Sequence, residues 1–256
     1  MQTAPSSPNP KPVSEIWKPE LTHLPRLTLA RRFFRVFIRL VCRALIFLYT
    51  RPAVRGMENY PRHGPALLVI NHLGDPDAVL ALAFLPEFPE ILGKIELRYD
   101  RRLTLLLDWL GILWVHRGQP DRRAISAALE AFRRGQRVII APEGRESVSG
   151  ALEEGTDGAA FLALKARVPI VPITLTGTEH RRIENAMKTR RRTPVTLTVG
   201  KPFFLSDLAL DGVKGSAGRH VALRAGTRLI METLARQLPS EYRGVYNYIG
   251  DEKIDK

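Results

Sequence analysis

The chain has 256 residues, of which 45% are hydrophobic, so it is long enough to bury the core of one large globular domain. Its single cysteine, Cys42, excludes an intramolecular disulfide and a cysteine-rich zinc site. Lysine and arginine number 39 against 26 acidic residues, a formal net charge of +13, which favours a polyanionic partner such as a phosphate, a nucleic acid or an anionic lipid surface.

Residues 1–24 begin with a proline- and serine-rich stretch that can bury little apolar surface. The stretch lacks the basic-then-apolar order of a secretory signal. We therefore expect a flexible tail over residues 1–24, with Trp17 as the side chain able to pin it.

Residues 25–50 are predicted to form an amphipathic helix. Steps of four residues advance by only about 40° around a helix, so Arg31, Arg35, Arg39 and Arg43 share one face, while aromatic and aliphatic residues cover the rest. The uncharged run from 44 to 50 is far shorter than the roughly 20 residues of a membrane-spanning helix. The pattern favours a helix in the membrane interface, with its arginines on lipid phosphates; a helix docked on the protein's own core is the alternative.

From residue 51 onward, short β-rich runs alternate with segments of helical periodicity, which predicts an α/β domain with a largely parallel central sheet flanked by helices. Helical segments are expected around Ala124–Phe132 and Leu223–Leu238, and no internal repeat is evident. Pro172 is expected to confine its strand to an edge or a bulge. The strands are predicted at Ala66–Ile70, Ile112–His116, Arg137–Ala141, Ile170–Thr176 and Val195–Val199.

The stretch Asn71-His72-Leu73-Gly74-Asp75-Pro76-Asp77 follows the first of these strands. Asp75 and Pro76 suit the N-cap and first position of a helix. His72, five positions before Asp77 across a tight turn, can share one ring nitrogen with that carboxylate and keep the other as a general base. A turn histidine with a capping acid is the simpler reading.

This stretch resembles the NHxxxxD block of the glycerolipid acyltransferases. Gly111–Arg117, Ala141–Gly144 and Val168–Pro172 resemble the second, third and fourth blocks of that family in the same order, over about residues 51 to 205. The resemblance is greatest to the 1-acylglycerol-3-phosphate acyltransferases.

The resemblance implies an O-acyltransferase of phospholipid biosynthesis, over residues 51–256, that acylates a lysophospholipid such as 1-acyl-sn-glycerol-3-phosphate to give phosphatidic acid. His72 would remove the acceptor's hydroxyl proton and Asp77 would hold the imidazole. Ser147 and Ser149 lack a GxSxG frame, so direct transfer without an acyl-enzyme is expected. No cofactor is expected; the acyl donor is either acyl-CoA or acyl carrier protein, and the enzyme should sit on the membrane's cytoplasmic face as a monotopic or peripheral protein.

Substrate binding is expected from Lys94, Gly111, Arg117, Glu143, Gly144 and Arg145. Arg117 and Lys94 suit the acceptor's phosphate, while Glu143 with Gly144 suits its glycerol hydroxyls. Pro169 is either part of the acyl site or structural. The third block departs from the family's Glu-Gly-Thr-Arg-Ser, because Arg145 and Glu146 follow Gly144, which leaves the acceptor's head group open. His116 replaces the acid or amide more usual there and is expected to be solvated.

Four other functions remain open. The acceptor could be glycerol-3-phosphate or another lysolipid, or the chain could be a non-catalytic lipid-binding protein. A metal enzyme could use His72, Asp75, Asp77, His116 and Glu143, although no paired-histidine spacing supports it, so no metal is expected. A nucleic-acid module would suit the net charge, but the basic residues are concentrated on a helix whose other faces are apolar, so no nucleic acid is expected.

The basic residues between His180 and Pro194 suit a second contact with anionic lipid.

Overall fold

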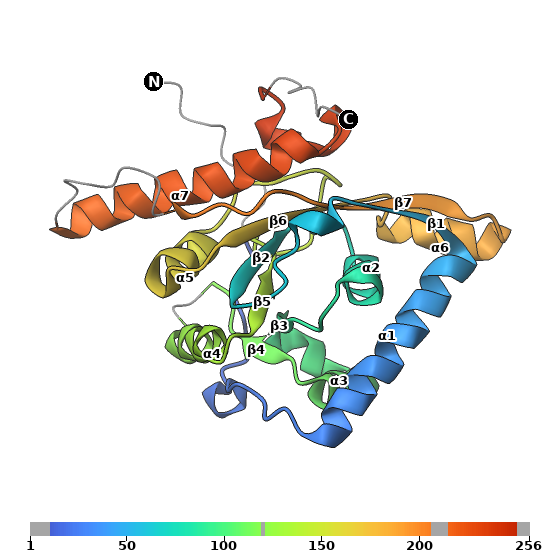
Figure 1. Cartoon of the computed structure of the whole chain (residues 1–256), viewed down its shortest axis with the longest axis horizontal. Coiled ribbons are helices and arrows are strands. Elements are labelled where there is room, and N and C mark those ends of the chain that lie inside the picture. Colours follow the sequence, from blue (N-terminus) through green and yellow to red (C-terminus); the bar gives the residue numbers. More distant parts are fainter. Residues whose placement is uncertain (1–10, 119–120, 206–214, 250–256) are drawn as a thin grey trace.

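The computed structural model of the protein describes residues 11–118, 121–205 and 215–249. In these residues a seven-stranded sheet lies between two layers of helices (Figure 1). The strand order is β1-β7-β6-β2-β5-β3-β4, and every neighbouring pair is parallel except β6 with β7. The predicted α/β architecture with a largely parallel sheet is confirmed.

The sheet contains all five predicted strands and two more. The predicted strands are β2 (Ala66–Ile70), β4 (Leu113–Val115), β5 (Arg137–Ile140), β6 (Ile170–Thr176) and β7 (Thr193–Val199). The sequence analysis missed β1 (Thr50–Arg55) and β3 (Glu90–Lys94). β1 is an edge strand with Pro52 and two arginines, so it lacks the alternation of a half-buried strand.

Pro172 is not on an edge strand, because β6 lies between β2 and β7, but the alternative prediction of a bulge is confirmed: the antiparallel register shifts by one residue between Ile173, opposite Val199, and Ile170, opposite Phe203. Pairing with β7 begins at the next residue, Ile173, opposite Val199, and the Pro172 carbonyl accepts a hydrogen bond from the Gly200 amide at 2.8 Å. The missing N–H of Pro172 therefore falls where the register shifts, between the Ile170–Phe203 bridge and the ladder that begins at Ile173.

The helices divide between the two faces of the sheet. One face carries α4 (Arg122–Arg133), α5 (Gly158–Ala166) and α7 (Gly215–Gln237), whose apolar residues share one core cluster. The other carries α1 (Leu29–Tyr49) and α2 (Pro76–Phe84), with α3 (Arg101–Leu110) and α6 (His180–Thr189) beside α1. Residues 67–69 of β2 are completely buried between the layers, as expected of a central parallel strand.

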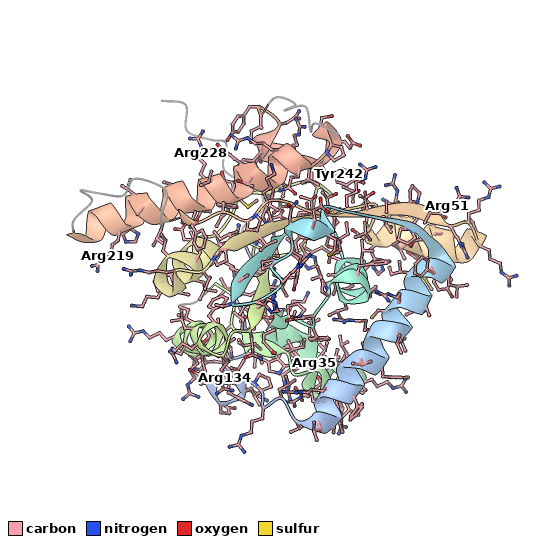
Figure 2. All side chains as sticks on the ribbon, viewed as in Figure 1. Arg35, Arg51, Arg134, Arg219, Arg228 and Tyr242 are labelled. Carbon is pink, nitrogen blue, oxygen red and sulfur yellow. The ribbon has the colours of Figure 1, made fainter. Side chains whose placement is uncertain are left out.

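The amphipathic helix forms as predicted in α1, but its arginines face the protein. The Arg35 guanidinium is buried, pairs with both carboxylate oxygens of Glu90 at 2.9 and 3.0 Å, and points toward the interior in Figure 2. Arg31 and Arg35 donate to carbonyls at the end of α3, and Arg39 and Arg43 donate to carbonyls at the end of α2. Unpaired carbonyls at a helix C-terminus attract cations. The expected contact of these arginines with lipid phosphates is therefore wrong.

The opposite face of α1 is apolar and exposed. At least half of the side chain is exposed at Leu29, Phe33, Val36, Phe37, Leu40, Phe47 and Leu48. Phe33, Phe37 and Leu40 are 74%, 58% and 59% exposed, and together these residues form a large apolar patch for a protein surface. In the part of the chain that the structure describes, no helix is long and apolar enough to cross a membrane.

Candidate active site

His72 and Asp77 form a hydrogen-bonded pair in the turn between β2 and α2. His72 Nδ1 lies 2.9 Å from Asp77 Oδ2, and the same oxygen accepts the amides of Leu73 and Gly74 at 2.6 and 3.0 Å. Asp77 is buried, whereas 29% of the His72 side chain is exposed. Because the carboxylate is held by two peptide amides, it fixes Nδ1 as the protonated nitrogen and leaves Nε2 for a substrate.

The surroundings of His72 make it a stronger base than a free histidine. Burial lowers the pKa of His72, but the hydrogen bond and negative charge of Asp77 outweigh it, with smaller contributions from Glu146 and Glu143, so the net effect raises the pKa. The ring can therefore accept a proton and stabilise the resulting imidazolium with a fixed carboxylate.

The neighbouring residues of this turn have structural roles. Asp75 stands at the predicted N-cap, but its side chain is exposed and makes no capping hydrogen bond. Asn71 is buried, and its amide group exchanges two hydrogen bonds with the backbone of Leu175, at 2.9 and 2.8 Å. Asn71 therefore fixes the turn to β6, a contact that the sequence analysis did not assign.

Glu143 fixes the same turn from the other side, at the end of β5. Its Oε1 accepts the His72 amide at 3.1 Å and its Oε2 accepts the Glu153 amide at 2.8 Å. Burial raises the pKa of Glu143 to about 7, even though these amides and His72 oppose the shift. Both oxygens hold peptide groups, so Glu143 is a positioning residue for His72, and its contact with acceptor hydroxyls stays a prediction.

The loop after Glu143 is held by Glu153, another residue that the sequence analysis did not single out. The Arg145 guanidinium pairs with Glu153 at 2.6 Å, with both side chains about nine-tenths buried, and Glu153 Oε1 accepts the Val148 amide at 3.0 Å. The Ser147 amide donates to the His72 carbonyl at 2.8 Å. Gly144 has a φ of +74° in the turn that opens this loop, a conformation that favours glycine.

Lys94 and Arg117 lie at the same edge of the sheet as His72. The parallel strands β2, β5, β3 and β4 are successive neighbours, and their carboxyl ends carry His72, Glu143, Lys94 and Arg117 in that order. Lys94 is exposed, and an Arg117 Nη atom lies 3.4 Å from Glu96 Oε2. Ligands of α/β sheets bind at this edge, and the binding of a phosphate by these two cations stays a prediction.

Two predicted residues lie at the opposite edge. Gly111 ends α3 with a φ of +76° just before β4, and a side chain there would press on Arg31 and Arg35. Pro169 precedes β6, and its carbonyl accepts the Leu67 amide at 2.9 Å. Neither is brought to His72, so both positions have a backbone role in the structure.

His116 is buried, contrary to the expectation that it is solvated. Its Nδ1 lies 2.8 Å from Asp121 Oδ2, its Nε2 accepts the Lys18 amide at 3.0 Å, and the Trp17 ring lies 4.7 Å away between centroids. Both ring nitrogens are therefore occupied by the protein.

Residues 11–24 pack on the domain, so the flexible tail predicted for 1–24 does not extend through them; residues 1–10 lie outside the described residues. Ser14 exchanges two hydrogen bonds with the backbone of Arg117, at 2.9 and 2.8 Å. Lys11 Nζ donates to the Glu143 carbonyl at 2.9 Å and to that of Glu154, and burial lowers the pKa of Lys11 despite the attraction of nearby glutamates. This segment thus links the Arg117 and Glu143 loops.

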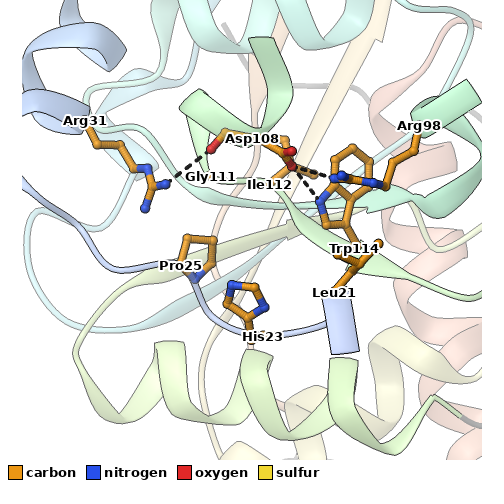
Figure 3. Close-up of a pocket in the computed structure, with 9 residues that line it drawn as sticks. All are labelled: Leu21, His23, Pro25, Arg31, Arg98, Asp108, Gly111, Ile112 and Trp114. Atoms are coloured by element: carbon orange, nitrogen blue, oxygen red, sulfur yellow. Dashed lines mark hydrogen bonds and ion pairs between the residues drawn. The ribbon is translucent and has the colours of Figure 1, made fainter. Parts of the chain in front are cut away.

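A separate cavity of about 190 Å³ opens at the amino end of β4 (Figure 3). Asp108 Oδ1 accepts hydrogen bonds there from Arg98 and from the indole of Trp114, at 2.7 and 3.1 Å. Since Gly111 and Ile112 line it, the cavity lies at the edge of the sheet away from His72. In residues 11–118, 121–205 and 215–249, no three histidine, cysteine or acidic side chains gather as a metal site.

Known proteins resemble the chain in sequence and in fold. The family model described as "Acyltransferase" matches residues 51–176, which contain His72, Lys94, Arg117 and Glu143. The structure of the 1-acyl-sn-glycerophosphate acyltransferase PlsC from Thermotoga maritima superimposes with a TM-score of 0.57 and 25% identity, over 82% of this chain and 83% of that one. The chain belongs to the glycerolipid acyltransferase family.

Acyltransferases from other organisms match over different lengths. The sheep 1-acyl-sn-glycerol-3-phosphate acyltransferase alpha is 28% identical over 219 residues, 83% of this chain and 72% of the relative. The chloroplastic enzyme of that name from Brassica napus is 27% identical over 151 residues, 58% of this chain. The match spans 44% of the Brassica relative's length.

Proposed function

We propose that the protein is an O-acyltransferase that moves a fatty acyl chain from a thioester to the free hydroxyl of 1-acyl-sn-glycerol-3-phosphate, giving phosphatidic acid in phospholipid biosynthesis. The observation that carries the proposal is the His72–Asp77 pair at 2.9 Å, with the histidine partly exposed at a sheet edge that also carries Lys94 and Arg117. Membership of the acyltransferase family and the names of the relatives support the same substrate class.

In the proposed reaction His72 Nε2 takes the proton of the acceptor hydroxyl as its oxygen attacks the thioester carbonyl. Asp77 stabilises the imidazolium that forms. When the carbon–sulfur bond breaks, the imidazolium returns the proton to the leaving thiolate, so the products are an ester and a thiol. No acyl-enzyme is needed, and the single cysteine is buried in α1.

In the proposed complex the acceptor's phosphate binds Lys94 and Arg117. A guanidinium matches a phosphate through two parallel hydrogen bonds. The contact of Arg117 with Glu96 is long, at 3.4 Å, and both side chains are about one-fifth exposed, so a phosphate can displace the carboxylate. The acyl donor is acyl-CoA or acyl carrier protein, and no further cofactor takes part.

The apolar face of α1 is the proposed contact with the membrane surface. Its exposed aromatic and aliphatic side chains suit the acyl boundary, as in a monotopic or peripheral protein on the cytoplasmic face. α6 packs beside α1 and is followed by arginines at 190, 191 and 192, which extend the contact to anionic lipids.

The test is thiol release from oleoyl-CoA, and separately from oleoyl carrier protein, with lysophosphatidic acid in detergent micelles. We expect acceptor-dependent release with at least one donor, and its loss in His72→Ala. If the wild type is inert while His72→Ala still binds lysolipid equally well, a non-catalytic lipid-binding protein is the better assignment. Thiol release with glycerol-3-phosphate in place of the lysolipid would show that glycerol-3-phosphate is the acceptor.

A further inference from the structure

A second polar cavity lies on the other side of the sheet from α1, where β1, β6 and β7 meet the end of α7. Its volume is about 390 Å³, within the range of about 300–1,000 Å³ typical of small-molecule sites. The lining residues are Arg55, Thr174, Thr176, Thr196, Thr198, Arg236, Gln237, Leu238, Pro239 and Arg243. Among the lining residues that the structure describes, none is acidic and three are arginines.

The four threonines form a block set by the strand register. Thr174 pairs with Thr198 and Thr176 with Thr196 across the antiparallel β6–β7 ladder, and Arg55 lies beside Thr198 on β1. Side chains alternate along a strand, and the residues between these threonines, Leu175 and Leu197, pack in the core under α1 and α2. The four hydroxyls therefore face α7 together.

These donors are not used by the fold. Within residues 11–118, 121–205 and 215–249, neither the four hydroxyls nor the Arg55 guanidinium makes a side-chain hydrogen bond or an ion pair with another protein group. Thr174 is 2% exposed, so its hydroxyl is positioned by packing. The rest of this face of the sheet is covered by apolar side chains of α5 and α7, which makes the polar block distinct.

Arg243 adds a fixed positive charge. It is 6% exposed, and its guanidinium donates to the carbonyls of Leu238 and Ile249 at 2.9 and 2.7 Å. The preceding residue, Tyr242, donates its hydroxyl to Glu179 at 2.7 Å and accepts the Gly177 amide at 3.3 Å. Tyr242 thus anchors the segment beside the end of β6, and Figure 2 shows it next to the end of α7.

We propose that this cavity binds the phosphate groups of a small phosphorylated molecule. Guanidinium groups and hydroxyls donate hydrogen bonds to phosphate oxygens, and among the described residues the Arg55 guanidinium and the four threonine hydroxyls are not engaged by another protein group. The site is separate from the acceptor phosphate site at Lys94 and Arg117, because it lies on the face of β6 and β7 and not at the carboxyl ends of β3 and β4. It does not depend on the proposed acyl transfer. The ligand's source is either the nucleotide part of a thioester donor or a separate phosphorylated molecule.

The test is calorimetric titration of the full chain with inorganic pyrophosphate, CoA and dephospho-CoA, at low and high salt. We expect saturable binding of pyrophosphate that weakens with salt, and that weakens about tenfold in Arg55→Gln through loss of one charge-assisted contact. Thr198→Val, which keeps the side-chain shape, should also weaken binding. Arg51→Gln is the matched control, because Arg51 is an exposed arginine on the same strand outside the cavity.

Arg117→Gln separates this cavity from the candidate active site. Binding that survives in Arg117→Gln and is lost in Arg55→Gln supports the proposal. Binding that is lost in Arg117→Gln but kept in Arg55→Gln overturns it, as does equal weakening by Arg51→Gln and Arg55→Gln, or no saturable heat with pyrophosphate. If CoA binds more tightly than dephospho-CoA and the difference disappears in Arg55→Gln, the source is the thioester donor; if only pyrophosphate binds, the source is a separate molecule.

Discussion

The Nδ1 atom of His116 lies 2.8 Å from Oδ2 of Asp121, which reproduces the 2.9 Å contact of His72 with Asp77. The pattern His-x-Gly-x-Pro-Asp occurs at both 72–77 and 116–121, each time between a strand and a helix. The prediction that the chain has no internal repeat overlooked this short one. The two pairs differ in access, since the His116 side chain is fully buried and 29% of the His72 side chain is exposed.

Replacing His116 should therefore affect stability and not chemistry. In His116→Ala the Lys18 amide loses its acceptor, and Asp121 Oδ2 loses the ring and keeps only the backbone amide of residue 116, which should lower the free energy of unfolding by about 2–4 kcal/mol. Activity per folded molecule should stay within a few-fold of wild type. Urea unfolding and thiol release on the same samples measure both quantities, with His72→Ala as the matched variant. A folded, stable His116→Ala protein with no activity would contradict this assignment.

Asp77→Asn should move the pH dependence of the reaction. Burial lowers the pKa of His72 and Asp77 raises it by more, so removing the carboxylate charge should lower the pKa of the histidine. The basic form of His72 is the active one, so the rise of kcat/KM with pH should shift to lower pH in the variant. The maximal rate should fall by about 10² to 10⁴, because the imidazolium loses its stabilising charge. An unshifted profile with a reduced rate would show that another group titrates.

Glu143→Gln should weaken the loop that holds His72. A glutamine has one acceptor oxygen, so either the His72 amide or the Glu153 amide would face an NH₂ group, at a cost of about 1–3 kcal/mol. The raised pKa, from 4.5 to about 7, also means that the folded state keeps a proton that the unfolded chain releases.

The stability of wild type relative to Glu143→Gln should accordingly fall as pH rises from about 4.5 to 7 and level off above it, by up to about 3 kcal/mol. Chemical unfolding of both proteins at several pH values measures the difference. A difference that does not fall with pH would mean that the Glu143 carboxyl of the folded protein is ionised throughout this range.

Periodicity predicted most of the fold because the central strands are apolar on both faces and the helices carry regular apolar stripes. It could not orient α1. A helix with an arginine stripe opposite an apolar face can turn its arginines either to lipid phosphates or to the protein. In this chain carbonyls at the ends of α2 and α3 bind the arginines, and these carbonyls are far from α1 in the sequence.

The candidate site was predictable where its chemistry is local. His72 and Asp77 are five residues apart across one turn, so their contact follows from spacing. The supporting contacts are not local: Lys11 reaches Glu143 across 132 residues, and Asn71 reaches Leu175 across 104. A lysine in a proline-rich start and a glutamate such as Glu153 carry no sequence pattern that marks them as partners of a distant loop.

The apolar face of α1 should carry the attachment to membranes. Phe33 and Phe37 are 74% and 58% exposed one helical turn apart, so replacing both by serine removes two aromatic rings from the contact while leaving the inward arginines in place. Each ring contributes about 1.5–3 kcal/mol when fully buried, so the double variant should bind vesicles more than a hundredfold less tightly. Flotation with vesicles of phosphatidylcholine and phosphatidylglycerol measures this binding.

Phe161→Ser on α5 is the control, since Phe161 is a partly exposed phenylalanine in the layer on the other face of the sheet. Because the arginines of α1 contact the protein, raising the salt should weaken binding less than the double substitution does; binding that salt abolishes but the substitution spares would place the attachment on the basic residues near α6 instead.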